Sequence, residues 1–183
     1  YTADPSSIPG YRQGGTITEI FEAQTKVLTP SVSTDVYSRR IQEIVLESLG
    51  TLNPETLEVE GQLAEAWQMD PKGLWLRARL RPNLRFSDGH PLTSDDVVYG
   101  YEYIMNEQID AERSRSILRD SIKSVKALDE RTVEFEFKES LFTNRTNALS
   151  IFVLPRHFYT QFSPAQINQS TGLLMGSGPF KVR

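Results

Sequence analysis

Two segments of the 183-residue chain alternate apolar and polar side chains with a period of two. In LWLRARL (74–80), leucines and an alanine alternate with Trp75, Arg77 and Arg79, and in RTVEFEF (131–137), valine and phenylalanines alternate with glutamates. Successive side chains of a strand point to opposite faces, so both segments predict strands with one buried and one solvated face. IKSVKAL (122–128) lies just before the turn at Asp129 and predicts the hairpin partner of RTVEFEF.

Helical patterns lie between and after these strands. Ser33, Thr34 and Asp35 offer oxygens for a helix N-cap, and Gly50 predicts the helix end. The apolar face predicted between them consists of Tyr37, Ile41, Ile44, Val45, Ser48 and Leu49. Further helices are predicted near residues 141–149 and after Pro155, and LAEAW (63–67) is interpreted as a helical turn or irregular segment. Residues 16–22 predict a strand, and GSGPF (176–180) predicts a turn into a strand. Because strands and helices mix without strict alternation, the fold class is α+β.

Composition excludes several classes of protein. The length fits one ordinary domain, and the net charge of -4 gives no electrostatic reason to expect nucleic acid as a partner. No apolar run approaches the roughly 20 residues of a membrane-spanning helix, so we expect no direct membrane span. The chain has no cysteine, which excludes disulfides, thiol catalysis and thiolate metal sites. The N-terminus lacks the basic and apolar pattern of a signal peptide, so we expect a signal peptide or lipid anchor to be absent from this chain.

The segment RFSDGHPLTSDDVVYGYEYI (85–104) concentrates three aspartates and a histidine before an apolar helical pattern. Asp88-Gly89 predicts a turn, and Thr93 is predicted as the N-cap of a helix with Asp96 at N3, which forms a capping box. Leu92 and Val97 then occupy the positions of a hydrophobic staple. The acidic residues therefore have a structural use at the positive end of the helix dipole.

A metal-dependent hydrolase that uses Asp88, His90, Asp95 and Asp96 is the alternative interpretation of this segment. Two consecutive residues at a helix start point about 100° apart, and no second histidine lies nearby to complete three zinc ligands. We therefore favour capping and expect no catalytic residue, no cofactor and no metal. His157 is interpreted as a surface or packing histidine, and the basic run RSRSILR (113–119) as a solvated helix face.

The order of these motifs carries a resemblance. LAEAW (63–67), LWLRARLR (74–81), RFSDG (85–89) and PLTSDDVVY (91–99) together resemble the characteristic segment of the family 5 extracellular solute-binding proteins, the oligopeptide, dipeptide and nickel receptors of ABC importers. GGTITEIFEAQ (14–24), DVYSRRIQEIVLESL (35–49) and GSGPFKV (176–182) are similar to the flanking pieces of that family. The resemblance thus extends from about residue 14 to residue 183.

The resemblance implies a partial type II periplasmic-binding-protein-like lobe that carries an inserted smaller mixed α/β domain, with the second lobe missing. Residues 1–32 would form a leader and the first strand of the large lobe, residues 33–170 the inserted domain, and residues 171–183 the return strand. It also implies a non-enzymatic, secreted protein of the periplasm or extracytoplasmic space. Such a protein binds a peptide or other small solute and works with a membrane ABC permease. Glu22, Ala23, Gln24 and Thr25, at the end of the first strand, are the ligand contacts that the resemblance implies. A stand-alone interaction domain remains the other alternative.

Overall fold

A computed structural model describes residues 27–33 and 35–182, together with Pro9, Thr18, Ile20 and Thr25. The strand predicted over residues 16–22 lies mostly outside the described residues, as do the expected ligand contacts Glu22, Ala23 and Gln24. Thr25, the fourth expected contact, is half-buried and lies in neither a helix nor a strand.

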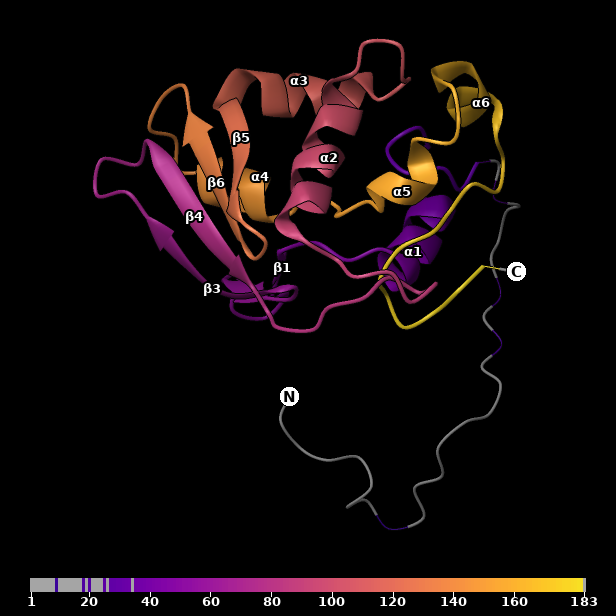
Figure 1. The fold of residues 1–183 in the computed structure, drawn as a ribbon, viewed down its shortest axis with the longest axis horizontal. Helices are drawn as coiled ribbons and strands as arrows, with labels where there is room; N and C mark the ends of the chain where they lie inside the picture. The colour runs from indigo at the N-terminus through magenta and orange to yellow at the C-terminus, as the bar shows by residue number, and fades with distance from the viewer. Residues whose placement is uncertain are drawn as a thin grey trace.

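An antiparallel sheet of four strands, in the order β3-β4-β6-β5, forms one side of the described chain (Figure 1). Its strands are β3 (Ala64–Met69), β4 (Trp75–Leu80), β5 (Ile122–Asp129) and β6 (Thr132–Phe137). The predicted hairpin of β5 and β6 is confirmed, and Phe135 lies opposite Val125 on one side and Leu76 on the other. A separate two-stranded sheet joins β1 (Gly50–Leu52) to β2 (Val59–Gly61).

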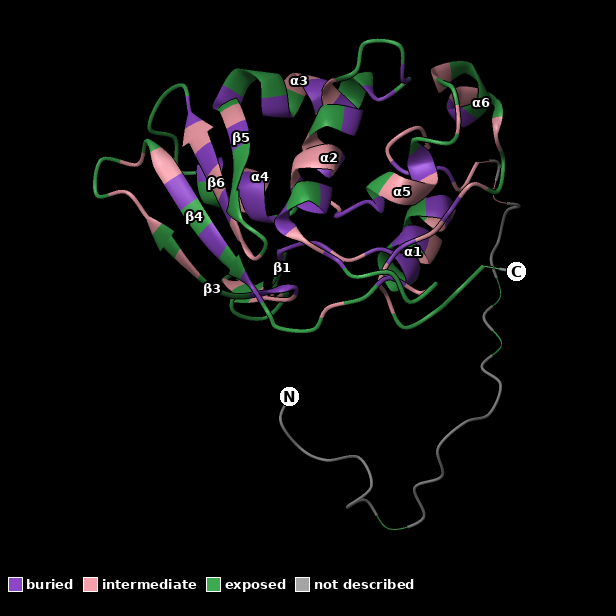
Figure 2. Ribbon diagram, in the orientation of Figure 1, coloured by how far each residue is buried: buried purple, intermediate pink, exposed green. Residues whose placement is uncertain are grey.

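Among the described residues, six helices accompany the sheets, and two of them pack on the apolar face of the four-stranded sheet. The helices are α1 (Val36–Val45), α2 (Ser94–Met105), α3 (Glu112–Ser121), α4 (Asn144–Leu149), α5 (Arg156–Tyr159) and α6 (Pro164–Gln169). Helix α2 packs on β5 and β6, and α3 packs on α2, α4 and β5. The alternation along β4 and β6 puts six of the predicted side chains into the core (Figure 2): Leu76, Ala78, Leu80, Val133, Phe135 and Phe137. Leu74, also predicted on this face, lies before the start of β4 and is exposed.

The opposite face of the sheet is the solvated one. Arg77 pairs with Glu134 at 2.7 Å and lies over the Trp75 ring at 4.6 Å, and Lys123 pairs with Glu136 at 2.6 Å. Such exposed ion pairs contribute about 0–1 kcal/mol each, so the face is polar without stabilising the fold strongly. This arrangement confirms the prediction of a sheet with one wet face.

Several local predictions were wrong. Residues 64–67 of LAEAW lie in strand β3 instead of a helical turn or irregular segment, because Ala64 and residues 66–69 pair with β4 on either side of an irregularity at Glu65. Helix α1 is capped by Asp35 as predicted but ends at Val45, well before Gly50. Its buried stripe is Ser38, Gln42 and Val45. No strand forms within the described residues 171–182, where backbone hydrogen bonds go instead to carbonyls at the end of α1.

Across the described part of the chain, the helices fall short of the length and apolar character that a membrane span requires.

Candidate functional site

The start of helix α2 is held by the side chain of Asp96. Asp96 forms the predicted capping box with Thr93, and its Oδ2 accepts a hydrogen bond from the Thr93 amide at 2.9 Å. Its Oδ1 accepts from the Arg156 amide, the first residue of α5, at 3.1 Å. Leu92 and Val97 are buried at the staple positions. The capping interpretation is confirmed, and the same carboxylate also ties α2 to α5.

The turn before α2 is organised around Asp88 and Gly89. Asp88 Oδ1 accepts the His90 amide at 3.0 Å, and the Phe86 amide donates to the His90 carbonyl at 2.9 Å. Gly89 has a φ of +94°, a backbone conformation that glycine adopts at little cost. The predicted Asp88-Gly89 turn is therefore confirmed, and the Asp88 and His90 side chains project from it together.

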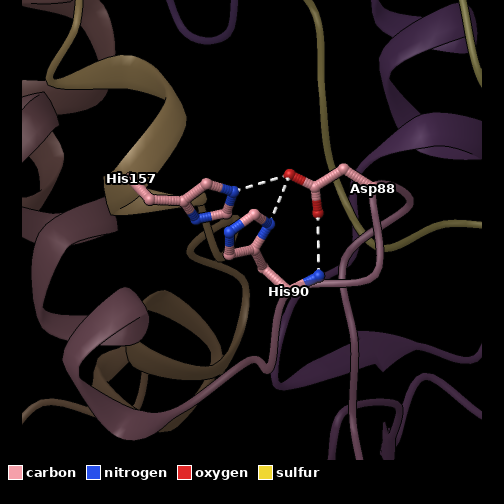
Figure 3. A group of neighbouring side chains, drawn as sticks. All are labelled: Asp88, His90 and His157. Atoms are coloured by element: carbon pink, nitrogen blue, oxygen red, sulfur yellow. Dashed lines mark hydrogen bonds and ion pairs between the residues drawn. The ribbon is translucent and has the colours of Figure 1, made fainter.

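The structure brings His157, from helix α5, onto this turn (Figure 3). Asp88 Oδ2 lies 2.7 Å from His157 Nε2 and 3.0 Å from His90 Nδ1. The two imidazole rings stack with their centroids 4.0 Å apart and their planes 24° from parallel. The statement that no second histidine lies near His90 was wrong, and His157, interpreted as a surface or packing histidine, has Asp88 as an acidic partner. We refer to Asp88, His90 and His157 as the Asp–His–His cluster.

The hydrolase alternative finds no support in this arrangement. It required Asp95 and Asp96 beside Asp88 and His90, whereas Asp96 is buried in the helix cap and Asp95 is exposed in the first turn of α2. Of the predicted set, the Asp–His–His cluster contains Asp88 and His90. Its third member is His157, and Asp95 and Asp96 are not part of it.

The environment of Asp88 favours its charged form. Partial burial raises the pKa of this carboxyl, but the hydrogen bond from His157, the bond from the His90 amide and the charges of the two imidazoles outweigh it. The pKa falls from 3.8 to about 2 as a result. Asp88 is thus a carboxylate at neutral pH, next to two ring nitrogens.

Two segments that are distant in the sequence, residues 28–29 and residues 170–171, lie side by side, and we refer to them as the crossing segments. The Leu28 amide donates to the Thr171 carbonyl at 2.9 Å, and the buried Thr29 hydroxyl donates to the Ser170 carbonyl at 2.9 Å. Gln42 of α1 holds the first segment by donating to the carbonyls of Leu28 and Thr29, each at 3.1 Å. These contacts join residues near both ends of the region between positions 33 and 170.

The segment after Thr171 then lies against the end of α1. The Gly178 amide donates to the Val45 carbonyl at 2.9 Å, and a Cβ on Gly176 would lie 2.4 Å from that same oxygen. Ser87 of the turn donates to the Gly176 carbonyl through its amide at 2.9 Å and its hydroxyl at 2.8 Å. The glycines of GSGPF therefore allow a close backbone approach between α1, the turn and the C-terminal segment.

A hollow of about 490 Å³ lies between α1, α3 and the end of α4. Its lining includes Asp35, Arg39, Arg113, Ile117 and Asn147. It combines charged, amide and apolar groups and is separate from the Asp–His–His cluster.

Arg115 of the basic run is buried, which corrects the prediction of a fully solvated helix face. Its guanidinium donates to the carbonyls of Ile104, Asn106 and Ile109 and pairs with Glu112 at 2.8 Å. Arg113 and Arg119 are exposed as predicted. Arg115 thus ties the end of α2 to α3 and is a structural residue.

The sequence profile described as bacterial extracellular solute-binding proteins, family 5 Middle, matches residues 58–183. The chain belongs to this family. Family 5 proteins are extracellular substrate receptors, and the resemblance drawn from the motif order is confirmed.

Known family 5 relatives are similar over most of the chain. The oligopeptide-binding protein AppA of Bacillus subtilis is 29% identical over 178 residues, which are 94% of this chain and 32% of AppA. The peptidoglycan-binding protein YepA of Agrobacterium fabrum is 27% identical over 134 residues, 70% of this chain and 20% of YepA. The chain therefore spans about a third or less of the length of these relatives.

Solved structures agree on the fold. AppA in complex with a nonapeptide superposes with a TM-score of 0.71 at 28% identity, over 84% of this chain and 31% of AppA. The ABC transporter substrate-binding protein CtaP of Listeria monocytogenes superposes with a TM-score of 0.74 at 24% identity, over 86% of this chain and 32% of CtaP. The mixed α/β structure is thus that of part of a type II periplasmic-binding protein.

Sequence reasoning missed His157 as a partner of Asp88. The chain has only two histidines, and their positions are 67 residues apart in the sequence. Neither local spacing nor periodicity joins the turn to α5, so the only available signal was the rarity of histidine itself.

Proposed function

We propose that this chain is part of a receptor that binds a peptide or similar small solute outside the cytoplasm and delivers it to a membrane ABC permease. The observation that carries the proposal is the family 5 match over residues 58–183, which includes the motif segment 85–99. The superposition of the chain on AppA is consistent with that match. AppA, which is similar over 94% of the chain, is an oligopeptide-binding protein. The role is binding without chemical conversion of the solute, in the periplasm or an equivalent extracytoplasmic space.

The proposed domain organisation assigns residues 33–170 to an inserted smaller domain and residues 1–32 and 171–183 to the large lobe. The hydrogen bonds from Leu28 and Thr29 to Thr171 and Ser170 support it, because the two ends of an inserted domain must lie side by side. In receptors of this architecture the solute is enclosed between two lobes that close by hinge motion. The two adjacent crossing segments would then carry the chain between the proposed lobes.

The solute contacts proposed for this chain are Glu22, Ala23, Gln24 and Thr25. They lie just before the first crossing segment in the sequence. A solute in contact with these residues alone would be open to water on its other side, and immobilising it costs several kcal/mol. We therefore expect the 183-residue chain to bind peptides weakly and the receptor with both lobes to bind them tightly.

Calorimetric titration with a mixed library of di- to pentapeptides tests the proposal. We expect the two-lobed receptor to bind library members and Glu22→Ala with Gln24→Ala to weaken binding, whereas Glu55→Ala, in an exposed loop, serves as the matched control. A receptor that binds no peptide but binds peptidoglycan fragments would show that the solute resembles that of YepA instead. A dissociation constant of about 1 μM or less, roughly -8 kcal/mol, for the 183-residue chain alone would favour a stand-alone binding domain.

A further inference from the structure

The two histidines of the chain direct ring nitrogens toward the same carboxylate oxygen. His90 Nδ1 and His157 Nε2 lie 3.0 Å and 2.7 Å from Asp88 Oδ2 (Figure 3). One ligand atom from each of the three side chains can be chosen so that all lie within 4.8 Å of one another. Among the described residues, this is the group that unites imidazole and carboxylate donors at metal-binding separation.

We infer that Asp88, His90 and His157 bind a divalent transition-metal ion, with Zn²⁺ as the ion that fits best. Two neutral imidazoles and one carboxylate are ligands typical of Zn²⁺ and its neighbours, whereas Mg²⁺ and Ca²⁺ prefer oxygen ligands only. Three protein ligands leave a fourth position for water or another ligand. This inference concerns a site separate from the proposed solute contacts and does not depend on them.

The distances require only a small adjustment, but the two rings stack with their planes 24° from parallel, so the His90 ring must turn out of the stack before both ring nitrogens can point at one ion. Zn²⁺ binds imidazole nitrogen and carboxylate oxygen at about 2.0–2.2 Å, so tetrahedral ligand atoms lie roughly 3.4 Å apart. The present separations of 2.7 Å and 3.0 Å must therefore widen by about half an ångström. The His90 side chain is 61% exposed, so its rotation meets little resistance from packing.

The surrounding contacts hold the donors in place. Asp88 Oδ1 already accepts the His90 amide, which leaves Oδ2 directed toward the two rings. His157 is anchored because the Asp96 carboxylate binds the Arg156 amide at the start of α5.

Such an ion would join the turn at residues 85–91 to helix α5, two segments that now meet through hydrogen bonds and ring stacking. The turn also contacts the C-terminal segment through Ser87 and Gly176. An ion that binds the folded chain and not the unfolded chain raises its stability by mass action. The site therefore has a structural role: a bound ion would stabilise the contact between the turn, α5 and the C-terminal segment.

Zinc titration of the untagged 183-residue chain tests the inference. We expect one equivalent of Zn²⁺ to bind in isothermal titration calorimetry at pH 7.5, and the melting temperature to rise and return to its starting value with EDTA. Because the chain has only two histidines and no cysteine, binding can be assigned by substitution. His90→Ala, His157→Gln and Asp88→Asn should each weaken binding at least about tenfold, the minimum cost of losing even an outer-shell partner. Asp95→Asn, an exposed carboxylate on the same segment, should leave binding unchanged.

The His157 ring also packs near the Phe86 ring, with the two centroids 5.8 Å apart, so His157→Gln can change the stability of the fold as well as zinc binding. If it does, the result for His90→Ala decides the test. Visible absorption of Co²⁺ in place of Zn²⁺ provides a second measurement, since tetrahedral nitrogen and oxygen ligation gives d–d bands that are much more intense, and at longer wavelength, than the weak bands of octahedral aqueous Co²⁺. No saturable Zn²⁺ binding by the unsubstituted chain, or unchanged binding in both histidine variants, would overturn the inference. Equal loss of binding in Asp95→Asn would also overturn it, because it would indicate diffuse attraction to acidic groups.

Discussion

Replacement of Asp96 by alanine tests how the motif segment holds the fold together. Asp96 is 7% exposed and accepts hydrogen bonds from two amides, those of Thr93 in its own helix cap and Arg156 at the start of α5. Loss of a cap costs about 1 kcal/mol, and loss of a hydrogen bond to a charged group costs about 1.5–3 kcal/mol. The Arg156 amide would also lose its partner. We therefore expect Asp96→Ala to lower the free energy of unfolding by about 2–4 kcal/mol beyond any effect of charge.

Asp95→Ala is the matched control for this substitution. It removes the same charge from the same helix turn, where the dipole makes a carboxylate worth about 0.3–1 kcal/mol, but its side chain is exposed. Urea unfolding followed by circular dichroism gives both free energies, and the difference between the variants isolates the hydrogen bonds of Asp96. Thr93→Ala should cost less than Asp96→Ala, because the bond from the Thr93 hydroxyl to Asp96 Oδ2 is long, at 3.3 Å, whereas Asp96 also binds the Arg156 amide. Equal stability of Asp95→Ala and Asp96→Ala would refute the claim that this carboxylate joins α2 to α5.

Three further substitutions probe other contacts of the fold. Gly176→Ala should destabilise the chain by about 1–3 kcal/mol, because its Cβ would collide with the carbonyl at the end of α1; Gly172→Ala, where a Cβ meets nothing within 4 Å, should be neutral or slightly stabilising in the same thermal melt. Arg115→Lys should cost about 2 kcal/mol or more, since an ammonium cannot reproduce the bonds from the buried guanidinium to three carbonyls, whereas Arg113→Lys on the exposed face of α3 should change nothing measurable. The hydroxyl and the amide of Ser38 donate hydrogen bonds to the Asp35 carboxylate and lower its pKa below 3.8. The stability that Asp35 contributes to the fold is therefore present above pH 3.8 and is lost as the pH falls through the lowered pKa. Asp35→Ala should therefore cost about 1 kcal/mol at pH 7 and flatten the acid side of the stability curve, and an unchanged acid limb would contradict this assignment.

The sheet was predictable because its signal is local. Alternation along residues 74–80 and 131–137 depends only on the pleat of a strand, and the buried side chains of β4 and β6 are those that the alternation indicates. The cap at Thr93 and Asp96 was predictable for the same reason, since its partners are three residues apart. Features of this kind need no knowledge of the rest of the fold.

Strand β3 and helix α1 show where local signals fail. Residues 64–69 contain Ala64, Glu65 and Ala66, which favour helix, but pairing with β4 satisfies their backbone in the sheet. The predicted apolar stripe of α1 was only partly right, because two of its three buried side chains, Ser38 and Gln42, are polar and only Val45 was among those predicted. Gln42 is buried in order to bind two carbonyls of the crossing segment, a role that no periodicity of apolar residues could indicate.

The candidate sites depend on contacts between residues far apart in the sequence, and these were only partly predictable. The Asp–His–His cluster joins Asp88 to His157 across 69 residues, and no local sequence pattern in either segment indicates this contact. The crossing segments differ in this respect. Thr29 and Ser170 are 141 residues apart, yet the proposed insertion of residues 33–170 requires its two ends to meet, and the resemblance therefore implied a contact that no local pattern contains.

That contact bears on how a complete receptor would move. Thr29 is fully buried and bonded to Ser170, and Gln42 of α1 fixes the first crossing segment to the proposed inserted domain. Closure of two lobes must therefore change backbone angles outside this bonded pair, because rotation within it would break buried hydrogen bonds that cost about 1–3 kcal/mol each to leave unsatisfied. In the proposed organisation, the hinge on the C-terminal side then lies beyond Phe180, because the amides of Gly178 and Phe180 donate to carbonyls at the end of α1, and the hinge on the N-terminal side lies before residue 28. The expected solute contacts Glu22–Thr25 precede that point in the sequence, so a hinge there would couple solute binding directly to the movement of the lobes.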